Sequence, residues 1–168
     1  MSRRTPRLPV VIALLAMVAL LAGGVITAPA AHAVGCWGDW CSGQGPQVTG
    51  CAADAQTVAW EDLPGARLEV RWSPTCKTNW ARYQQYPRGW YMGNVPVTLR
   101  AVQDTGYMQS HVYGENNPPA EGTTTWTPMI YSPVHKVRAE IVVWCGDMTL
   151  FKAAMDCAIN GVVSTDAV

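Results

Sequence analysis

The chain has 168 residues, and its twelve Lys or Arg balance twelve Asp or Glu, so the formal net charge at pH 7 is zero. No block of basic residues occurs beyond the first few positions, which argues against nucleic acid as a partner. The length suits one ordinary domain and no more.

The N-terminal segment predicts a secretory signal peptide. Three arginines precede an apolar run at Val10–Ala22, and the motif Ala31-His32-Ala33 has the small residues of a cleavage site. The run is shorter than the roughly 20 residues that a membrane-spanning helix needs. Alternatives are an uncleaved anchor, a lipidation box at the first cysteine and twin-arginine export. We expect residues 1–33 to be removed and residues 34–168 to form a single domain.

All six cysteines follow this cleavage site, and an even number in an exported chain predicts three disulfides. Fifteen pairings are formally possible. Four cysteines lie early and two late, so we expect the early four to pair among themselves and the last two to pair with each other. Zinc is the competing interpretation, but no Cys-x2-Cys pair occurs and the histidines are scattered. The cysteines are Cys36, Cys41, Cys51, Cys76, Cys145 and Cys157.

Several segments alternate between apolar and polar residues with a period of two, which is typical of half-buried strands. The pattern predicts a mainly β fold, a small antiparallel sandwich or partly open barrel with one or two short helices. The clearest predicted strands are Arg67–Trp72, Val95–Gln103 and Lys136–Val143, and weaker ones are Thr78–Tyr83, Gln109–Tyr113 and Thr123–Trp126. The predicted short helices are Asp54–Trp60 and Met148–Ala158.

The aliphatic core is lean. After the signal peptide, the chain keeps only four Leu, three Ile, fifteen Val and one Phe, which is little for a globular domain. Eight Trp and six Tyr supply part of the missing apolar area, and we expect Trp72 and Trp80 in the core. Because each disulfide typically contributes about 2 to 4 kcal/mol, we expect the crosslinks to be essential to this fold.

Two motifs carry a resemblance to a known family. Cys-Trp-Gly-Asp-Trp-Cys-Ser-Gly begins at Cys36, and Trp-Ser-Pro-Thr-Cys-Lys-Thr-Asn-Trp-Ala begins at Trp72. With these motifs and its cysteine spacing, the chain resembles a family of small secreted actinobacterial proteins known only as a domain of unknown function. Gly45 departs from that family, which usually has an acidic residue there. The resemblance implies secretion, disulfides and a Gram-positive envelope, and it implies no activity.

Aromatic residues in loops are the best candidates for ligand binding. Trp37 and Trp40 lie in a Gly-containing loop between two cysteines, while Arg88, Trp90 and Tyr91 belong to a second aromatic segment. A rigid ring held in water can stack against a sugar face or dock a protein partner at low entropic cost, and Arg adds cation–π contacts. The competing interpretation is that these rings fill the core.

The catalytic interpretations are weaker than structural ones. Asp104-Thr105-Gly106 matches the aspartic protease tripeptide, but one copy after a strand predicts a turn. Ser42 lies beside a cysteine in the wrong order for a serine nucleophile loop. Other candidates are the acid–base histidines His111 and His135, the carboxylates Glu61, Asp62 and Glu115, and a calcium loop at Tyr113–Gly122.

The sequence therefore favours a secreted, non-catalytic interaction module of the bacterial envelope or medium, without a metal or cofactor. Its expected partner is a cell-wall glycan or an extracellular protein. A secreted hydrolase and a structural spore or wall component are the alternatives.

The first prediction concerns processing. Protein recovered from the medium should begin at Val34, and all six of its thiols should resist alkylation until a reductant is added. Intact-mass spectrometry with and without reduction measures both properties. A retained leader or thiols that react without reductant would contradict the prediction.

Overall fold

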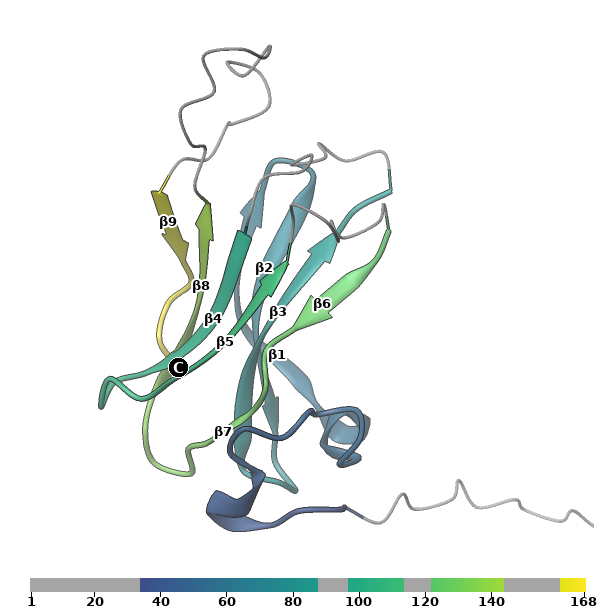
Figure 1. Cartoon of the computed structure of the whole chain (residues 1–168), viewed down its shortest axis with the longest axis vertical. Helices are drawn as coiled ribbons and strands as arrows, with labels where there is room; N and C mark the ends of the chain where they lie inside the picture. Colours follow the sequence, from purple (N-terminus) through teal and green to yellow (C-terminus); the bar gives the residue numbers. More distant parts are fainter. Residues whose placement is uncertain (1–33, 88–96, 114–121, 144–160) are drawn as a thin grey trace, which may run out of the picture. The chain divides into compact units, whose positions relative to one another are not determined.

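The computed structural model describes residues 34–87, 97–113, 122–143 and 161–168, which form two antiparallel β-sheets (Figure 1). The first sheet has the order β1-β2-β3-β6, and a short strand β7 also pairs with β3. The second has the order β5-β4-β8-β9. The strands are β1 Gln56–Leu63, β2 Ala66–Ser73, β3 Thr78–Gln85, β4 Val97–Gln103, β5 Met108–Tyr113, β6 Thr124–Trp126, β7 Ile130–Tyr131, β8 Val137–Val143 and β9 Gly161–Ser164. Two four-residue 3₁₀ helices, η1 Gly38–Cys41 and η2 Cys51–Asp54, precede the strands.

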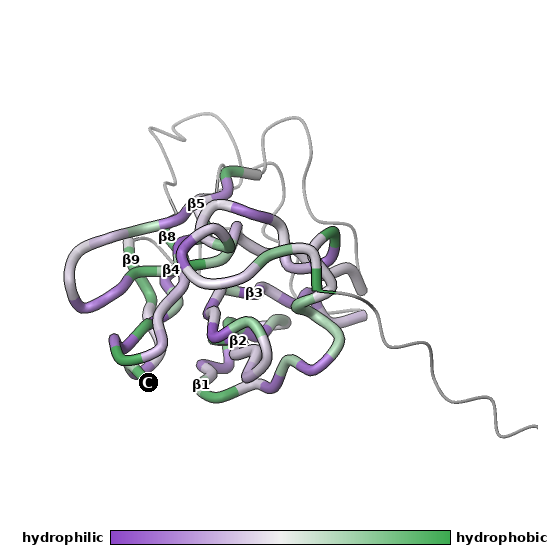
Figure 2. Tube along the Cα trace, turned by 90° about the horizontal axis from the view of Figure 1, so that it is seen from below, coloured by the Kyte–Doolittle hydropathy of each residue, from purple (hydrophilic) through white to green (hydrophobic). Residues whose placement is uncertain are grey.

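The two sheets bury one aliphatic core. Along β2, Leu68 and Val70 are fully buried in this core, whereas Glu69 between them points to the opposite face, as strand geometry requires. Figure 2 shows this alternation of hydrophobic and hydrophilic residues along the strands. The core comprises Ala59, Leu63, Ala66, Leu68, Val70, Ala81, Tyr83, Leu99, Ala101, Ile130, Val137, Ala139 and Ile141. Since both sheets contribute, the predicted β-sandwich is confirmed, and the strands do not close into a barrel.

All six predicted strands are present, each within three residues of its expected bounds. The predicted helix at Asp54–Trp60 is wrong, because the chain enters β1 at Gln56 and pairs with β2. The Asp54 carboxylate accepts hydrogen bonds from Ser73 Oγ (2.6 Å) and Thr75 N (2.9 Å), which holds the end of η2 against the end of β2. This tertiary contact and the sheet pairing outweigh the local tendency toward a helix.

The remaining differences from expectation are smaller. Strands β7 and β9 were not predicted, because two and four residues are too few to show an alternating pattern. Within the part of the chain that the structure describes, the only helices are the two 3₁₀ turns, and none is long and apolar enough to cross a membrane. The predicted helix at Met148–Ala158 lies outside the described residues.

A tyrosine hydroxyl lies inside the core. Tyr83 is 1% exposed, and its hydroxyl donates a 2.7 Å hydrogen bond to Gln85 Oε1. Burial raises the pKa of Tyr83 to about 12 from its ordinary value of 10.0. The folded protein therefore holds this proton more tightly than the unfolded chain does.

The second prediction follows from this proton. The stabilisation is complete below pH 10 and is lost as the pH rises toward 12, because the unfolded chain ionises first. Relative to a Tyr83→Phe variant, the wild-type free energy of unfolding should fall by up to about 2–3 kcal/mol across this window. Denaturant titrations at several alkaline pH values measure the difference. Tyr107→Phe, at an exposed tyrosine, is the control; because it keeps Tyr83, its free energy of unfolding should fall with rising pH as that of the wild type does.

Candidate functional site

The most exposed aromatic side chains of the described residues lie in a small loop before the first strand. Trp37 is 84% exposed and Trp40 is 73% exposed. Both belong to the segment Cys36–Cys41, here called the Trp tip, whose ends are joined by a disulfide with a Cα–Cα distance of 5.2 Å. Trp37 occupies the N-cap position of η1 in an extended conformation, and Trp40 lies within η1.

The sequence of the Trp tip determines its local geometry. Gly38 has a φ of +59°, a left-handed conformation that glycine adopts without steric cost, and it lets the chain turn directly after Trp37. Ser42 closes the turn, because its amide donates to Asp39 O (2.9 Å) and its hydroxyl donates to Asp39 Oδ1 (3.1 Å).

Hydrogen bonds hold the residues that directly follow the Trp tip against β7 and the residue before it. The amide of Tyr131 donates to Ser42 Oγ (3.0 Å), and Gly43 N donates to Met129 O (2.9 Å). Met129 N in turn donates to Gln44 O (2.9 Å). Figure 1 shows η1 beside β7 at one end of the molecule. The tip is thus a supported loop, and a ligand that docks on it would order little additional chain.

A second small core lies beneath the tip and is built from sulfur and aromatic groups. Cys36 Sγ lies 3.6 Å from Cys51 Sγ, which brings the tip disulfide against the Cys51–Cys76 disulfide. Trp80, 3% exposed, and Met129, fully buried, pack against these sulfurs. Pairing of the early four cysteines among themselves is therefore confirmed. Three of these sulfurs lie within 4.8 Å of one another, but each is committed to a disulfide and is not available as a zinc ligand.

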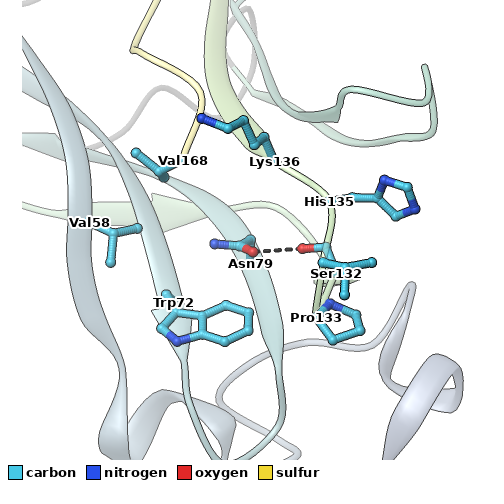
Figure 3. Close-up of a pocket in the computed structure, with 9 residues that line it drawn as sticks. Val58, Trp72, Asn79, Ser132, Pro133, His135, Lys136 and Val168 are labelled. Carbon is cyan, nitrogen blue, oxygen red and sulfur yellow. Dashed lines mark hydrogen bonds between the residues drawn. The ribbon is translucent and has the colours of Figure 1, made fainter.

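A cavity of about 320 Å³ opens at the same end, between β1–β3 and the loop that joins β7 to β8. Figure 3 shows the Trp72 ring on one wall and the Ser132 hydroxyl, which donates a 2.7 Å hydrogen bond to Asn79 Oδ1. Val58 and Pro133 add apolar surface, and an aromatic wall with amide and hydroxyl groups nearby is chemically suited to a small polar ring. Trp72 was expected in the core, yet it is only half-buried because it faces this cavity.

Among the candidates that the structure describes, His135 lies beside Asp104 and His111 lies apart from both. His135 Nδ1 lies 3.0 Å from Asp104 Oδ1, and both side chains are about half exposed. The His135 ring turns away from Ser132, whose hydroxyl is bonded to Asn79 (Figure 3). His111 lies on β5, where its cross-strand partner is Leu99 on β4. Leu99 is four residues, or about 13 Å of strand, before Gln103, the residue that precedes Asp104.

The aspartate of the protease-like tripeptide has a structural role. Asp104 lies in the β4–β5 turn, its amide donates to Lys136 O (3.0 Å), and its carboxylate accepts from Lys136 N (3.2 Å). It therefore fixes the loop before β8, and the predicted turn is confirmed.

The predicted carboxylate pair of Glu61 or Asp62 with Glu115 stays a prediction, because Glu115 lies outside the described residues. Glu61 and Asp62 are consecutive on β1, so their side chains point to opposite faces, and Asp62 pairs with Arg67 at 2.7 Å. Arg67 also lies over the Trp60 ring, 5.7 Å from its centroid, a cation–π contact that the sequence did not reveal.

The candidates outside the described residues are Arg88, Trp90, Tyr91, Glu115, most of the calcium loop, Cys145 and Cys157.

Comparison with known proteins identifies the family. Residues 39–140 match the family described as "Protein of unknown function (DUF2690)". The chain belongs to this family. Neither the curated proteins nor the solved structures include a match. The DUF2690 match covers Trp40, the Cys51–Cys76 disulfide and every strand from β1 to β7, and it carries no assigned activity.

The third prediction compares the two disulfides of this DUF2690 chain. The Cys51–Cys76 bond closes a loop with a sequence separation of 25, whereas Cys36–Cys41 closes one of 5. From loop entropy, the Cys51→Ala/Cys76→Ala variant should lose about 3.5 kcal/mol of unfolding free energy and the Cys36→Ala/Cys41→Ala variant about 2 kcal/mol. Denaturant unfolding of both variants without reductant gives the order. The reverse order would show that loop entropy does not govern these crosslinks.

Proposed function

We propose that the protein is an exported, non-catalytic binding module that docks on cell-wall polysaccharide through Trp37 and Trp40. Export is proposed from the sequence of residues 1–33, and the paired cysteines are compatible with an oxidising extracellular compartment.

The observation that carries the proposal is the exposure of both indoles, 84% for Trp37 and 73% for Trp40, in a chain that is short of aliphatic residues. A lean core would gain from burying these rings, as it does with Trp80, which is 3% exposed. Their retention in water on a crosslinked loop supports a role in recognition.

Polysaccharide is the favoured partner because of the shape and rigidity of the tip. Two flat rings on a loop of six residues offer a small apolar surface, suited to the C–H faces of sugar rings and too small for a standard protein interface of about 800 Å² per partner. The disulfide and the bonds to β7 hold the loop before binding, which lowers the entropic cost of association.

A hydrolase is the second candidate, and the geometry gives it little support. Hydrolysis needs an acid–base group beside a nucleophile or a second carboxylate. Within the described ranges, Ser132, His135 and the carboxylates of β1 are each engaged elsewhere or point apart.

The fourth prediction tests binding directly. Purified, oxidised protein should be retained on at least one of insoluble peptidoglycan, chitin and cellulose. A Trp37→Ala/Trp40→Ala variant should bind at least tenfold more weakly, because truncated Trp anchors typically cost more than 1 kcal/mol each. Depletion of protein from solution at increasing polymer concentration measures the affinity.

Trp60→Ala is the matched control, since Trp60 is 55% exposed but lies on β1, outside the tip. It should bind as the wild type does. Failure of the wild-type protein to bind any of the three polymers, or an equal loss with Trp60→Ala, would contradict the proposal.

A further inference from the structure

A second recess lies on the outer face of the first sheet, away from the aliphatic core. It has a volume of about 200 Å³ and is here called the arginine groove. Its walls come from the loop before η2 and from β2, β3 and β6. The lining residues that matter here are Gln47, Arg71, Trp80, Arg82, Thr124 and Trp126.

Strand register brings the charged groups of this groove together. Glu69 and Arg82 are direct cross-strand partners on β2 and β3, and Arg71 lies opposite Trp80. Arg82 Nε donates a 2.6 Å hydrogen bond to Glu69 Oε2, and Arg82 Nη2 forms an ion pair with the same oxygen. Glu69 is only 3% exposed, and Arg82 neutralises its buried negative charge.

Arg71 is held by neutral acceptors instead. Its Nη1 donates to Thr57 Oγ1 and its Nη2 donates to Ala55 O, both at 2.6 Å. Among the described residues it has no ion-pair partner, so two guanidinium groups share one carboxylate and the groove has a net charge of +1. Burial lowers the pKa of Arg71, as does the positive charge of Arg82, while Glu69 raises it. Arg71 therefore lies near a second positive charge as well as near the buried carboxylate.

The remaining walls are aromatic. Trp126 is the cross-strand partner of Arg82 on β6 and is half-buried, and Trp80 is packed on the sulfur core. An anion that enters the groove would therefore meet a guanidinium beside indole surface, a combination that favours an organic anion over a bare inorganic one. A surplus of one positive charge matches a monoanion, and the planar guanidinium matches a carboxylate in two-point geometry.

We propose that the arginine groove binds a small organic carboxylate, with the carboxylate on Arg71 and the attached apolar atoms against Trp126. A peptide C-terminus and a sugar acid carry the same chemistry. The proposal stands independently of the Trp tip, since no groove residue belongs to Cys36–Cys41.

The fifth prediction is a titration of the oxidised full chain, followed through its indole N–H resonances by NMR. The probes are N-acetyl-alanyl-alanine, the same peptide as its C-terminal amide, glucuronate and inorganic phosphate. We expect saturable shifts of the Trp80 and Trp126 resonances with at least one of the two carboxylates, and no saturation with the amide. Saturation by the peptide alone or by glucuronate alone supports the proposal and identifies the source of the carboxylate.

Arg71→Gln should raise the dissociation constant of that carboxylate at least tenfold, because a charged hydrogen bond is lost. Arg67→Gln is the matched control, since Arg67 lies on the same strand and face but pairs with Asp62 outside the groove, and its dissociation constant should stay within twofold of wild type. If Arg71→Gln fails to fold, Arg71→Lys keeps the charge without the planar fork and should still bind several-fold more weakly. The Trp37→Ala/Trp40→Ala variant should bind the carboxylate unchanged, which separates this site from the polysaccharide proposal.

The proposal is overturned if neither carboxylate gives a saturable shift, or if the amide or phosphate binds as tightly as the better carboxylate. Equal weakening by Arg71→Gln and Arg67→Gln would overturn it too, because the effect would then be one of general surface charge.

Discussion

The covalent link between Cys51 and Cys76 is the constraint on which the rest of the structure depends. The described segment before β1, residues 34–55, has only two 3₁₀ turns, so it has no regular hydrogen-bond ladder with which to hold itself on the sheet. The disulfide fastens η2 to the β2–β3 turn, and the 3.6 Å contact of Cys51 Sγ with Cys36 Sγ extends that attachment to the Trp tip. Loop closure of this kind limits the unfolded chain more than it adds contacts to the folded one.

Because of this attachment, each face of the first sheet packs against a separate core. Its inner face carries Leu68 and Val70 against the second sheet, and its outer face carries Trp80 against the sulfur atoms. A chain with few leucines and one phenylalanine can therefore bury both faces of a central strand, using aliphatic groups on one side and Trp with disulfides on the other. Strand β3 is accordingly buried at almost every position.

The sequence predicted the strands because their period-two pattern is local. It could not predict that Arg82 would pair with Glu69, since that contact depends on the register between β2 and β3. The helix predicted at Asp54–Trp60 failed for the same reason, because a partner strand and the Asp54 bond to Ser73 decide its conformation. Residue type alone also does not distinguish the exposed Trp40 from the buried Trp80. Only the glycine and cysteine neighbours of Trp40 indicated that it lies in an exposed loop.

The two proposed sites stand on one crosslinked segment. The Trp tip is closed by Cys36–Cys41, and Gln47 and Ala52, which wall the arginine groove, lie between Cys41 and Cys76 in the loop that Cys51 fastens. Reduction would free the Trp tip and this wall of the groove from their covalent attachment to the sheet and would also lower the stability of the fold. Binding at both proposed sites should therefore depend on the oxidised state of the chain. The disulfides thus couple both proposed sites to the stability of the first sheet, because the same crosslinks that hold these walls also restrict the unfolded chain.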